Sequence, residues 1–393
     1  MNDSLSTQRS GRGKIFILDA SKRCEPSAFL FTKAVQFFLV NGYHLAEHIE
    51  DGDILLVNTC CVTEGKIVTS RTALDSARAL GNGKTIVLFG CMASLPLPEV
   101  EREGLICIGP KSLCELDTHF PHHTSVDSIG VNRLPPALYE PGQGLGYEDH
   151  FLLIAQGCAN RCSYCNIRRA KGDVRSESVD RILQELHAGL RRGVRDFALL
   201  ADDCASYGCD IGSDLVQLME ELFAVAPRFG LKLGYVYPQF VVTQFERLRR
   251  VFGTGRIRYA NIPVQSGSQR IVDLMNRRYR VDAVLEALRQ LKEEAPETIF
   301  CTHIMVNFPT ETPDDFLKSL AIANDFDEVV FLHYSDNRNT PAASLLPKIT
   351  ETEVSRRLEM ASDYANQCKP GRSAVIKDFD CDRPYNMQVA SKG

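Results

Sequence analysis

Three cysteines lie in one short loop of the chain, in the stretch Gly157-Cys158-Ala159-Asn160-Arg161-Cys162-Ser163-Tyr164-Cys165. Three thiolates at this C-x3-C-x2-C spacing can bind three irons of one iron–sulfur cube and leave the fourth iron without a protein ligand. A structural zinc site would need a second cysteine pair or a spaced histidine pair, and neither stands nearby. The stretch therefore predicts a 4Fe-4S cluster with an open iron rather than three incidental loop cysteines.

The composition is that of an ordinary globular protein. The 393 residues suffice for two or three domains, no apolar run could cross a membrane, and the N-terminal segment lacks a signal-peptide core. We therefore expect a cytoplasmic protein without a membrane partner. Because that compartment keeps thiols reduced, 14 cysteines favour metal or redox chemistry over disulfides. With a net charge of -5, a nucleic-acid partner is not expected, and Arg168, Arg169 and Lys171 are interpreted as a solvated basic face.

Residues 14–120 predict a small α/β domain that follows a disordered lead at 1–13. Strands are expected at 14–20, 53–58, 85–90 and 105–109, and helices at 26–41 and 64–80. Continuous apolar strands that alternate with helices predict a doubly wound parallel sheet covered on both faces. Ligands of such sheets bind beyond the carboxyl ends of the strands.

Three cysteines fall at that carboxyl edge. Cys24 follows the first strand, Cys60 ends the second and Cys91 ends the third. Thiols far apart in sequence then lie together, as a second three-cysteine cluster requires. A small buried residue at each strand end is the alternative, and it is weaker for three positions in register. Cys61 is adjacent to Cys60, so either could be the ligand.

Residues 149–345, reached through a linker at 121–148, predict a partial β/α barrel. Strands that alternate with helices are expected at 151–156, 197–200, 231–236, 259–264, 299–306 and 329–333. Such barrels carry their active site at the carboxyl ends of the strands, where the cysteine loop also lies. A helix at about 351–367 and a polar tail make up the C-terminal region, 346–393.

Polar and aromatic residues at these strand ends are the candidate site residues. Asp202, Tyr237 and Gln265 are predicted to be catalytic. Cofactor contacts are predicted for Tyr164, Asp202, Gln265, Ser266, Asn307 and Tyr334. For His303 and His333, packing inside the barrel and a catalytic role remain open.

The cysteine loop with its Tyr164 resembles the signature of the radical S-adenosylmethionine (SAM) superfamily. That resemblance implies a 4Fe-4S cluster held by Cys158, Cys162 and Cys165, whose open iron chelates SAM. One electron, supplied by a donor such as flavodoxin or ferredoxin, then cleaves SAM to a 5′-deoxyadenosyl radical that removes a substrate hydrogen. The cofactor carries the chemistry, and the protein positions it.

Over about residues 14–368 the chain resembles the radical SAM methylthiotransferases. The matching stretches are Asn58-Thr59-Cys60, Gly90-Cys91-Met92-Ala93, Tyr207-Gly208, Tyr235-Val236-Tyr237-Pro238, Pro263-Val264-Gln265-Ser266-Gly267-Ser268, Met275-Asn276-Arg277, Phe308-Pro309-Thr310-Glu311-Thr312 and Thr340-Pro341-Ala342. The resemblance implies an auxiliary 4Fe-4S cluster on Cys24, Cys60 and Cys91 that carries the sulfur inserted into a C–H bond. One SAM supplies a methyl group and another supplies the radical.

Several positions depart from that family. Lys171-Gly172 stands where Arg-Gly is usual, Asp202 stands where Gln is frequent, and Asn307 and Thr310 occupy usual glycine positions. The sequence also ends before the TRAM domain with which family members that modify tRNA or a ribosomal protein grip their substrates. The departures favour a C–S bond-forming enzyme that acts on a small molecule or a peptide natural product.

Two alternatives remain open. The first is a tRNA or ribosomal-protein methylthiotransferase without a TRAM domain, for which salt-sensitive RNA binding is expected. The second is a non-catalytic iron–sulfur redox sensor, which would hold a cluster but would not cleave SAM.

Overall fold

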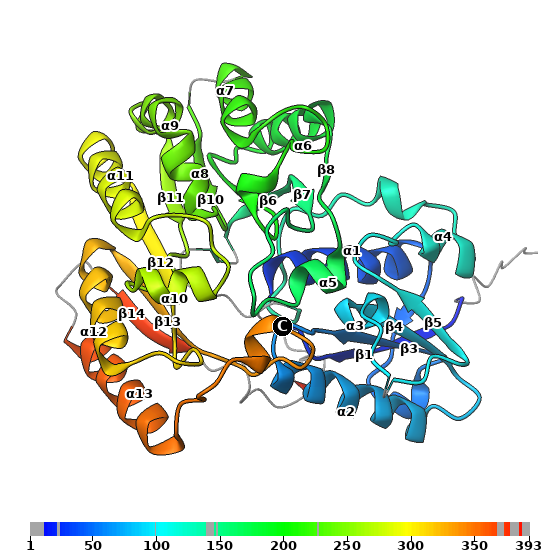
Figure 1. Ribbon diagram of the computed structural model, residues 1–393. Helices are drawn as coiled ribbons and strands as arrows, with labels where there is room; N and C mark the ends of the chain where they lie inside the picture. The colour runs from blue at the N-terminus through cyan, green and yellow to red at the C-terminus, as the bar shows by residue number, and fades with distance from the viewer. Residues whose placement is uncertain are drawn as a thin grey trace, which may run out of the picture.

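The computed structural model describes residues 12–21, 24–98, 100–138, 145–146, 148–225, 228–367, 373–377 and 385–386. Its N-terminal half is built on a sheet in the order β15-β1-β3-β4-β5, with β2 beside β1 (Figure 1). All pairs are parallel except that of β15 with β1. The strands are β1 (Lys14–Asp19), β2 (His44–Leu45), β3 (Ile54–Thr59), β4 (Thr85–Gly90), β5 (Leu105–Ile108) and β15 (Tyr385–Asn386).

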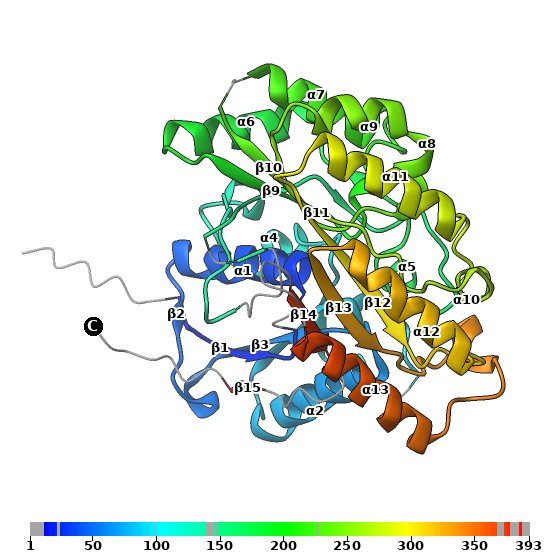
Figure 2. The same ribbon diagram turned by 90° about the vertical axis from the view of Figure 1, so that its left-hand side faces the viewer.

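Helices cover both faces of this sheet, as the doubly wound fold predicts. Helix α1 (Glu25–Val40) lies on one face and α2 (Glu64–Leu80) on the other (Figures 1 and 2). Their apolar residues belong to separate cores, which contain Phe31 and Phe38 of α1 and Ile67 and Leu74 of α2. Two short helices, α3 (Cys91–Ser94) and α4 (Glu115–His119), follow β4 and β5.

The second sheet is fully parallel and has the order β14-β13-β12-β11-β10-β9-β6. Its strands are β6 (His150–Leu153), β9 (Asp196–Leu200), β10 (Gly230–Leu233), β11 (Ile257–Asn261), β12 (Ile299–Val306), β13 (Glu328–His333) and β14 (Ser373–Lys377). Its helices are α5 (Ile167–Lys171), α6 (Val179–Arg191), α7 (Leu215–Val225), α8 (Pro238–Thr243), α9 (Phe245–Phe252), α10 (Gln269–Leu274), α11 (Val281–Glu294), α12 (Pro313–Ile322) and α13 (Glu351–Asn366). The six predicted strands thus form a partial β/α barrel, and β14 adds a seventh from the region predicted to be a tail.

The expected strand at 151–156 is split in two. Its first part is β6, and its second part, β7 (Ala155–Gln156), pairs antiparallel with β8 (Arg175–Ser176). The β7–β8 pair brackets the cysteine loop and α5. Consequently the loop begins at the end of a short ribbon and not directly on the barrel sheet.

One apolar core joins the two halves. Phenylalanines of α1 share it with Phe151, Leu200 and Tyr259 of the barrel strands, so α1 packs against the open face of the barrel sheet. The segment predicted as a linker also contributes Val126 and Leu134, which are buried in the same core. These residues bury apolar surface between the halves, which a solvated linker would not do.

Some predictions fall outside the described residues, namely the disordered lead as far as residue 11 and most of the tail beyond 367. Within the described part of the chain, no helix is long and apolar enough to cross a membrane.

Candidate functional site

The cysteine loop is held in place by its backbone. Gly157 has φ +83, and a Cβ at this position would lie 2.4 Å from the carbonyl oxygen of Asp173, so a side chain does not fit. The Gly157 N–H donates to Asp202 Oδ2 at 2.8 Å, and Ser163 N donates to the Met275 carbonyl at 2.9 Å. The loop is therefore fixed both to the segment after β9 and to the end of α10.

Each of the three loop thiols accepts a hydrogen bond. Asn160 N lies 3.4 Å from Cys158 Sγ, Ile167 N lies 3.3 Å from Cys165 Sγ, and Arg277 Nη1 lies 3.6 Å from Cys162 Sγ. Burial raises the pKa of Cys158 and Cys165 to about 12. Such thiols stay protonated until a metal displaces the proton, and N–H donors then stabilise the thiolate.

The second cysteine set lies at the carboxyl edge of the N-terminal sheet, as predicted. Cys24 interacts electrostatically with both Cys60 and Cys91, and burial raises the pKa of all three thiols. Cys61 packs in the apolar core with Cys91 and Met92, whereas the thiol interactions of Cys24 are with Cys60 and Cys91. The geometry therefore favours Cys60 over Cys61 as the third member of the set.

Both sets suit clusters better than single ions. Among the described residues, no three His, Cys, Asp or Glu side chains converge closely enough to hold one metal ion. In an iron–sulfur cube each cysteine binds a different iron, so the sulfurs stand apart. Three thiols on one loop and three at one sheet edge provide that kind of donor set.

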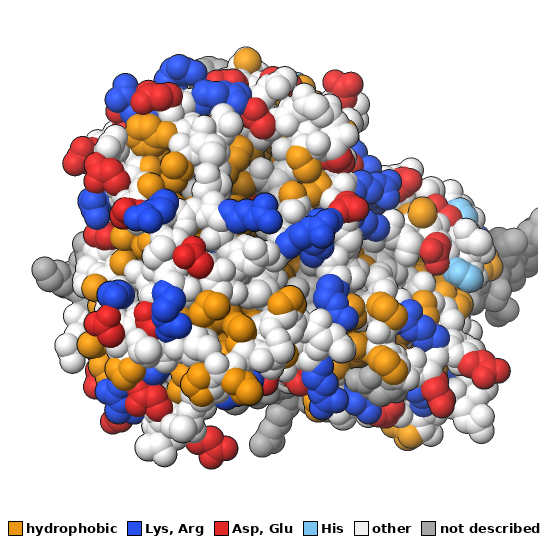
Figure 3. Space-filling model, in the orientation of Figure 1, with side chains coloured by type: hydrophobic (Ala, Val, Ile, Leu, Met, Phe, Trp, Pro, Cys, Tyr) orange, Lys and Arg blue, Asp and Glu red, His pale blue; other side chains and the backbone are white. Residues whose placement is uncertain are grey.

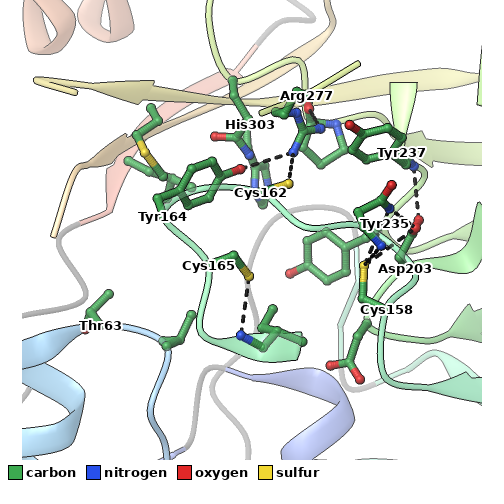
Figure 4. Close-up of a pocket in the computed structure, with 18 of the residues that line it drawn as sticks. Thr63, Cys158, Cys162, Tyr164, Cys165, Asp203, Tyr235, Tyr237, Arg277 and His303 are labelled. Atoms are coloured by element: carbon green, nitrogen blue, oxygen red, sulfur yellow. Dashed lines mark hydrogen bonds between the residues drawn. The ribbon is translucent and has the colours of Figure 1, made fainter. Parts of the chain in front are cut away.

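One cavity of about 260 Å³ lies between the halves and is lined by the first cysteine set and by one member of the second. Cys158, Cys162 and Cys165 face it from the loop, and Cys24 faces it from the N-terminal half. Figure 4 shows the loop cysteines across from Tyr235, Tyr237 and His303 of the barrel. An open iron at either set would therefore face the same space.

Arg277 is a site residue that the sequence analysis did not single out, although it lies within the quoted Met275-Asn276-Arg277 stretch. It is 6% exposed, and besides Cys162 its guanidinium donates to the hydroxyls of Tyr164 and Tyr279, each at 3.1 Å. Its charge lies 4.6 Å from the centre of the Tyr237 ring. Arg277 thus provides a buried positive charge at the loop cysteines.

Asp203 contacts the cysteine loop at Asn160 and Cys158. Its Oδ2 accepts from Asn160 Nδ2 at 2.8 Å and lies 3.9 Å from Cys158 Sγ, and its Oδ1 accepts from Tyr237 N at 3.1 Å. Burial raises the pKa of Asp203, while the hydrogen bonds lower it. This carboxyl group therefore orients Asn160 and the Tyr237 segment around Cys158.

The predicted site residues divide into two groups. Asp202, Tyr237, Gln265, Tyr334 and Tyr164 line the cavity, and so do His303 and His333. Gln265 holds a left-handed backbone at φ 71, and its buried Oε1 has no hydrogen-bond partner in the described part of the chain. A glutamine in this conformation with a free acceptor suits a ligand contact.

Ser266 and Asn307 are not among the residues that line the cavity, and their cofactor role stays a prediction. Ser266 is fully buried, and its hydroxyl pairs with Ser319 at 3.0 Å. Asn307 directs its amide toward His333 Nδ1 at 3.2 Å. Neighbouring side chains at a strand end can face different sides of the sheet, and the sequence did not show which of them face the cavity.

Lys171 is also placed differently from the prediction. Its side chain is 2% exposed rather than solvated, and its Nζ lies 2.6 Å from Asp202 Oδ1, whose side chain is 3% exposed. Asp202 therefore binds the backbone of the loop with one oxygen and Lys171 with the other.

Comparisons with known proteins agree with this site. Residues 152–323 match the family model of the radical SAM superfamily, and residues 24–106 match an uncharacterized protein family, UPF0004. A ribosomal protein uS12 methylthiotransferase RimO of Syntrophotalea carbinolica is 30% identical over 76% of this chain and 69% of its own length. The chain belongs to the radical SAM methylthiotransferase family. A probable threonylcarbamoyladenosine tRNA methylthiotransferase of Archaeoglobus fulgidus is 29% identical over 82% of this radical SAM protein and 77% of its own length.

A solved structure shows the same fold in a more distant enzyme. The radical SAM methyltransferase TsrM of Kitasatospora setae superposes with a TM-score of 0.58 at 13% identity, over 94% of this chain and 92% of that one. The chain is thus a radical SAM enzyme, and its family implies SAM and two 4Fe-4S clusters as cofactors.

Proposed function

We propose that this enzyme is a methylthiotransferase that acts on tRNA or a ribosomal protein. Its cysteines Cys158, Cys162 and Cys165 would hold the cluster that binds SAM, and Cys24, Cys60 and Cys91 would hold the auxiliary cluster. When bound, these groups supply the radical that removes a hydrogen atom and the sulfur that replaces it.

The observation that supports the proposal is the shared cavity. Cys24 and the three loop cysteines line one cavity, so hydrogen removal and sulfur delivery can act on the same substrate carbon. Two sites in separate pockets would need a substrate that moves between them. The aromatic wall of Tyr235 and Tyr237 would exclude water from that carbon.

The relatives favour a macromolecular substrate over a small molecule or a peptide natural product, because their names specify tRNA or ribosomal protein uS12.

A surface feature favours tRNA over a ribosomal protein as the substrate. Arg161 in the cysteine loop and Arg278 after α10 are exposed, and no carboxylate among the described residues pairs with either. Asn276 Nδ2 donates to the Arg161 carbonyl at 2.6 Å, so the two arginine segments adjoin. Lys and Arg side chains also cross the middle of one face (Figure 3).

These exposed arginines are chain neighbours of the cavity-lining residues Cys162 and Arg277, and there they would contact phosphates. We therefore expect binding of tRNA that weakens steeply with salt. Loss of both charges in Arg161→Gln/Arg278→Gln should reduce the salt slope by about two phosphate contacts. Arg195→Gln/Arg228→Gln on the barrel surface is the matched control.

The test is methyl transfer from labelled SAM under anaerobic reduction, with total tRNA, ribosomal protein uS12 or a peptide pool as the acceptor. Label in tRNA, absent from Cys24→Ala/Cys60→Ala/Cys91→Ala, is expected. Label in uS12 alone would replace tRNA with the protein substrate. Label only in peptides or free metabolites would overturn the macromolecular proposal. In wild type about eight irons are expected, and about four in each cysteine triple variant.

A further inference from the structure

The strongest feature that the proposed function leaves unexplained is the buried Lys171–Asp202 pair. Burying two opposite charges seldom adds stability, because an apolar pair of similar size is often equally or more stable. Two positions that depart from the family pattern, Lys171 and Asp202, also prove to be partners in space. The pair therefore calls for a role other than holding the fold together.

Helix α5 places Lys171 at the second cysteine set. This helix belongs to the radical-cluster loop, yet it packs against α3, which begins at Cys91. Ala170 lies in the apolar core of the N-terminal half, and Asn166 Nδ2 donates to the Cys61 carbonyl at 3.1 Å. The ammonium group at the end of α5 consequently interacts electrostatically with Cys24 and Cys91.

Asp202 connects this charge to the first cysteine set. Its Oδ1 pairs with Lys171 Nζ at 2.6 Å, and its Oδ2 accepts from Gly157 N at 2.8 Å, directly before Cys158. Asp202 also lines the shared cavity. A single carboxylate thus contacts the backbone directly before the first cysteine set and an ammonium group that interacts electrostatically with the second.

We propose that Lys171 and Asp202 are positioning residues that set the charge at the auxiliary cluster and thereby tune its reduction potential. The inference rests on the proposed auxiliary cluster of Cys24, Cys60 and Cys91. Reduction adds negative charge to a cluster, so a buried ammonium nearby favours the reduced state and a carboxylate opposes it. Lys171 raises the midpoint potential, and Asp202 offsets part of that effect.

The experiment is an anaerobic redox titration of the full-length two-cluster enzyme followed by EPR. Adding SAM identifies the radical cluster, because only its signal changes on SAM binding. Lys171→Met is expected to shift the auxiliary midpoint to a more negative value, and Asp202→Asn to a more positive one. Lys171→Arg, which keeps the charge, should stay near wild type, and Lys171→Met/Asp202→Asn should lie between the single variants.

Arg277→Met serves as the matched control, since it removes the buried positive charge at the other cysteine set. It should shift the radical cluster and leave the auxiliary midpoint unchanged. If Lys171→Met fails to load iron, the auxiliary midpoint of Asp202→Asn still tests the inference, because a shift to a more positive value is expected there. Single variants that both leave the midpoint unmoved, or that shift it in the same direction, would overturn the inference.

Failure of the premise gives a different result. If Cys24→Ala/Cys60→Ala/Cys91→Ala retains all the iron of wild type, no auxiliary cluster exists, and the proposed function fails together with this inference. If that variant loses about half of its iron while the Lys171 and Asp202 variants keep the wild-type midpoint, only the inference fails.

Discussion

Replacing Arg357 with methionine should destabilise the enzyme strongly, because it breaks a buried ion pair. The Arg357 side chain is 2% exposed and that of Glu311 is fully buried, and Arg357 Nη1 lies 2.8 Å from Glu311 Oε2. Arg357 Nη2 also donates to the Glu311 carbonyl at 3.0 Å, which attaches α13 to the barrel. Removing one partner of such a pair costs about 3–5 kcal/mol.

The loss of folding stability in Arg357→Met should also depend on pH. Burial raises the pKa of Glu311 to about 7, opposed by the Asn307 N–H and by Arg357. Without Arg357 this pKa rises further, so the folded variant holds a proton that the unfolded chain releases. For an acid with a raised folded-state pKa, stability falls as pH rises from the unfolded pKa through the folded one. Each further unit of pKa shift adds about 1.4 kcal/mol to the loss above neutral pH.

Urea unfolding of anaerobically prepared protein, followed by circular dichroism at about pH 6 and about pH 8.5, measures both effects. Arg356→Met is the matched control: Arg356 lies on the same helix, is 48% exposed, and pairs with Glu353. Its loss should be much smaller than that of Arg357→Met, because water screens an exposed ion pair. The reasoning is refuted if Arg357→Met costs no more than the control, or if its cost is the same at both pH values.

The remaining predictions concern the cysteine sites. Cys60→Ala should lose the auxiliary cluster, whereas Cys61→Ala should keep it, because the thiol interactions of Cys24 are with Cys60 and Cys91. Iron and sulfide analysis decides, and equal iron loss would contradict the assignment. Arg277→Met should lower the midpoint potential of the radical cluster and slow 5′-deoxyadenosine formation, because it removes the positive charge beside Cys162. Arg277→Lys should keep part of this charge effect. An unchanged potential in Arg277→Met would exclude an electrostatic role of Arg277 at Cys162. Gly157→Ala should impair cluster loading on the loop, because the new Cβ would meet two backbone carbonyls. Gly193→Ala, at φ +84 in open space, should lower stability by only about 1 kcal/mol. Equal effects of the two substitutions would refute the steric argument.

The sequence alone determined the elements and the cofactor chemistry. Apolar periodicity placed β3, β4 and α2 within a residue of their observed ends, since these segments bury continuous or one-sided apolar surface. The spacing of Cys158, Cys162 and Cys165 predicted cluster chemistry without any structure, because three ligands on one loop are close in space by covalent geometry. The family resemblance was confirmed by the comparisons, whereas the small-molecule or peptide substrate was not supported by them.

Tertiary structure decided which side chains meet. Ser266 and Gln265 are neighbours in sequence, yet only Gln265 reaches the cavity, because the backbone turns into the left-handed region at Gln265 and the Ser266 hydroxyl pairs with Ser319 of α12. Lys171 looked like part of a solvated basic face, and its burial against Asp202 depends on packing between α5 and the N-terminal half. A local pattern carries no record of such a contact, since Asp202 lies 31 residues further along the chain and α5 is covered only when the two halves of the chain pack together.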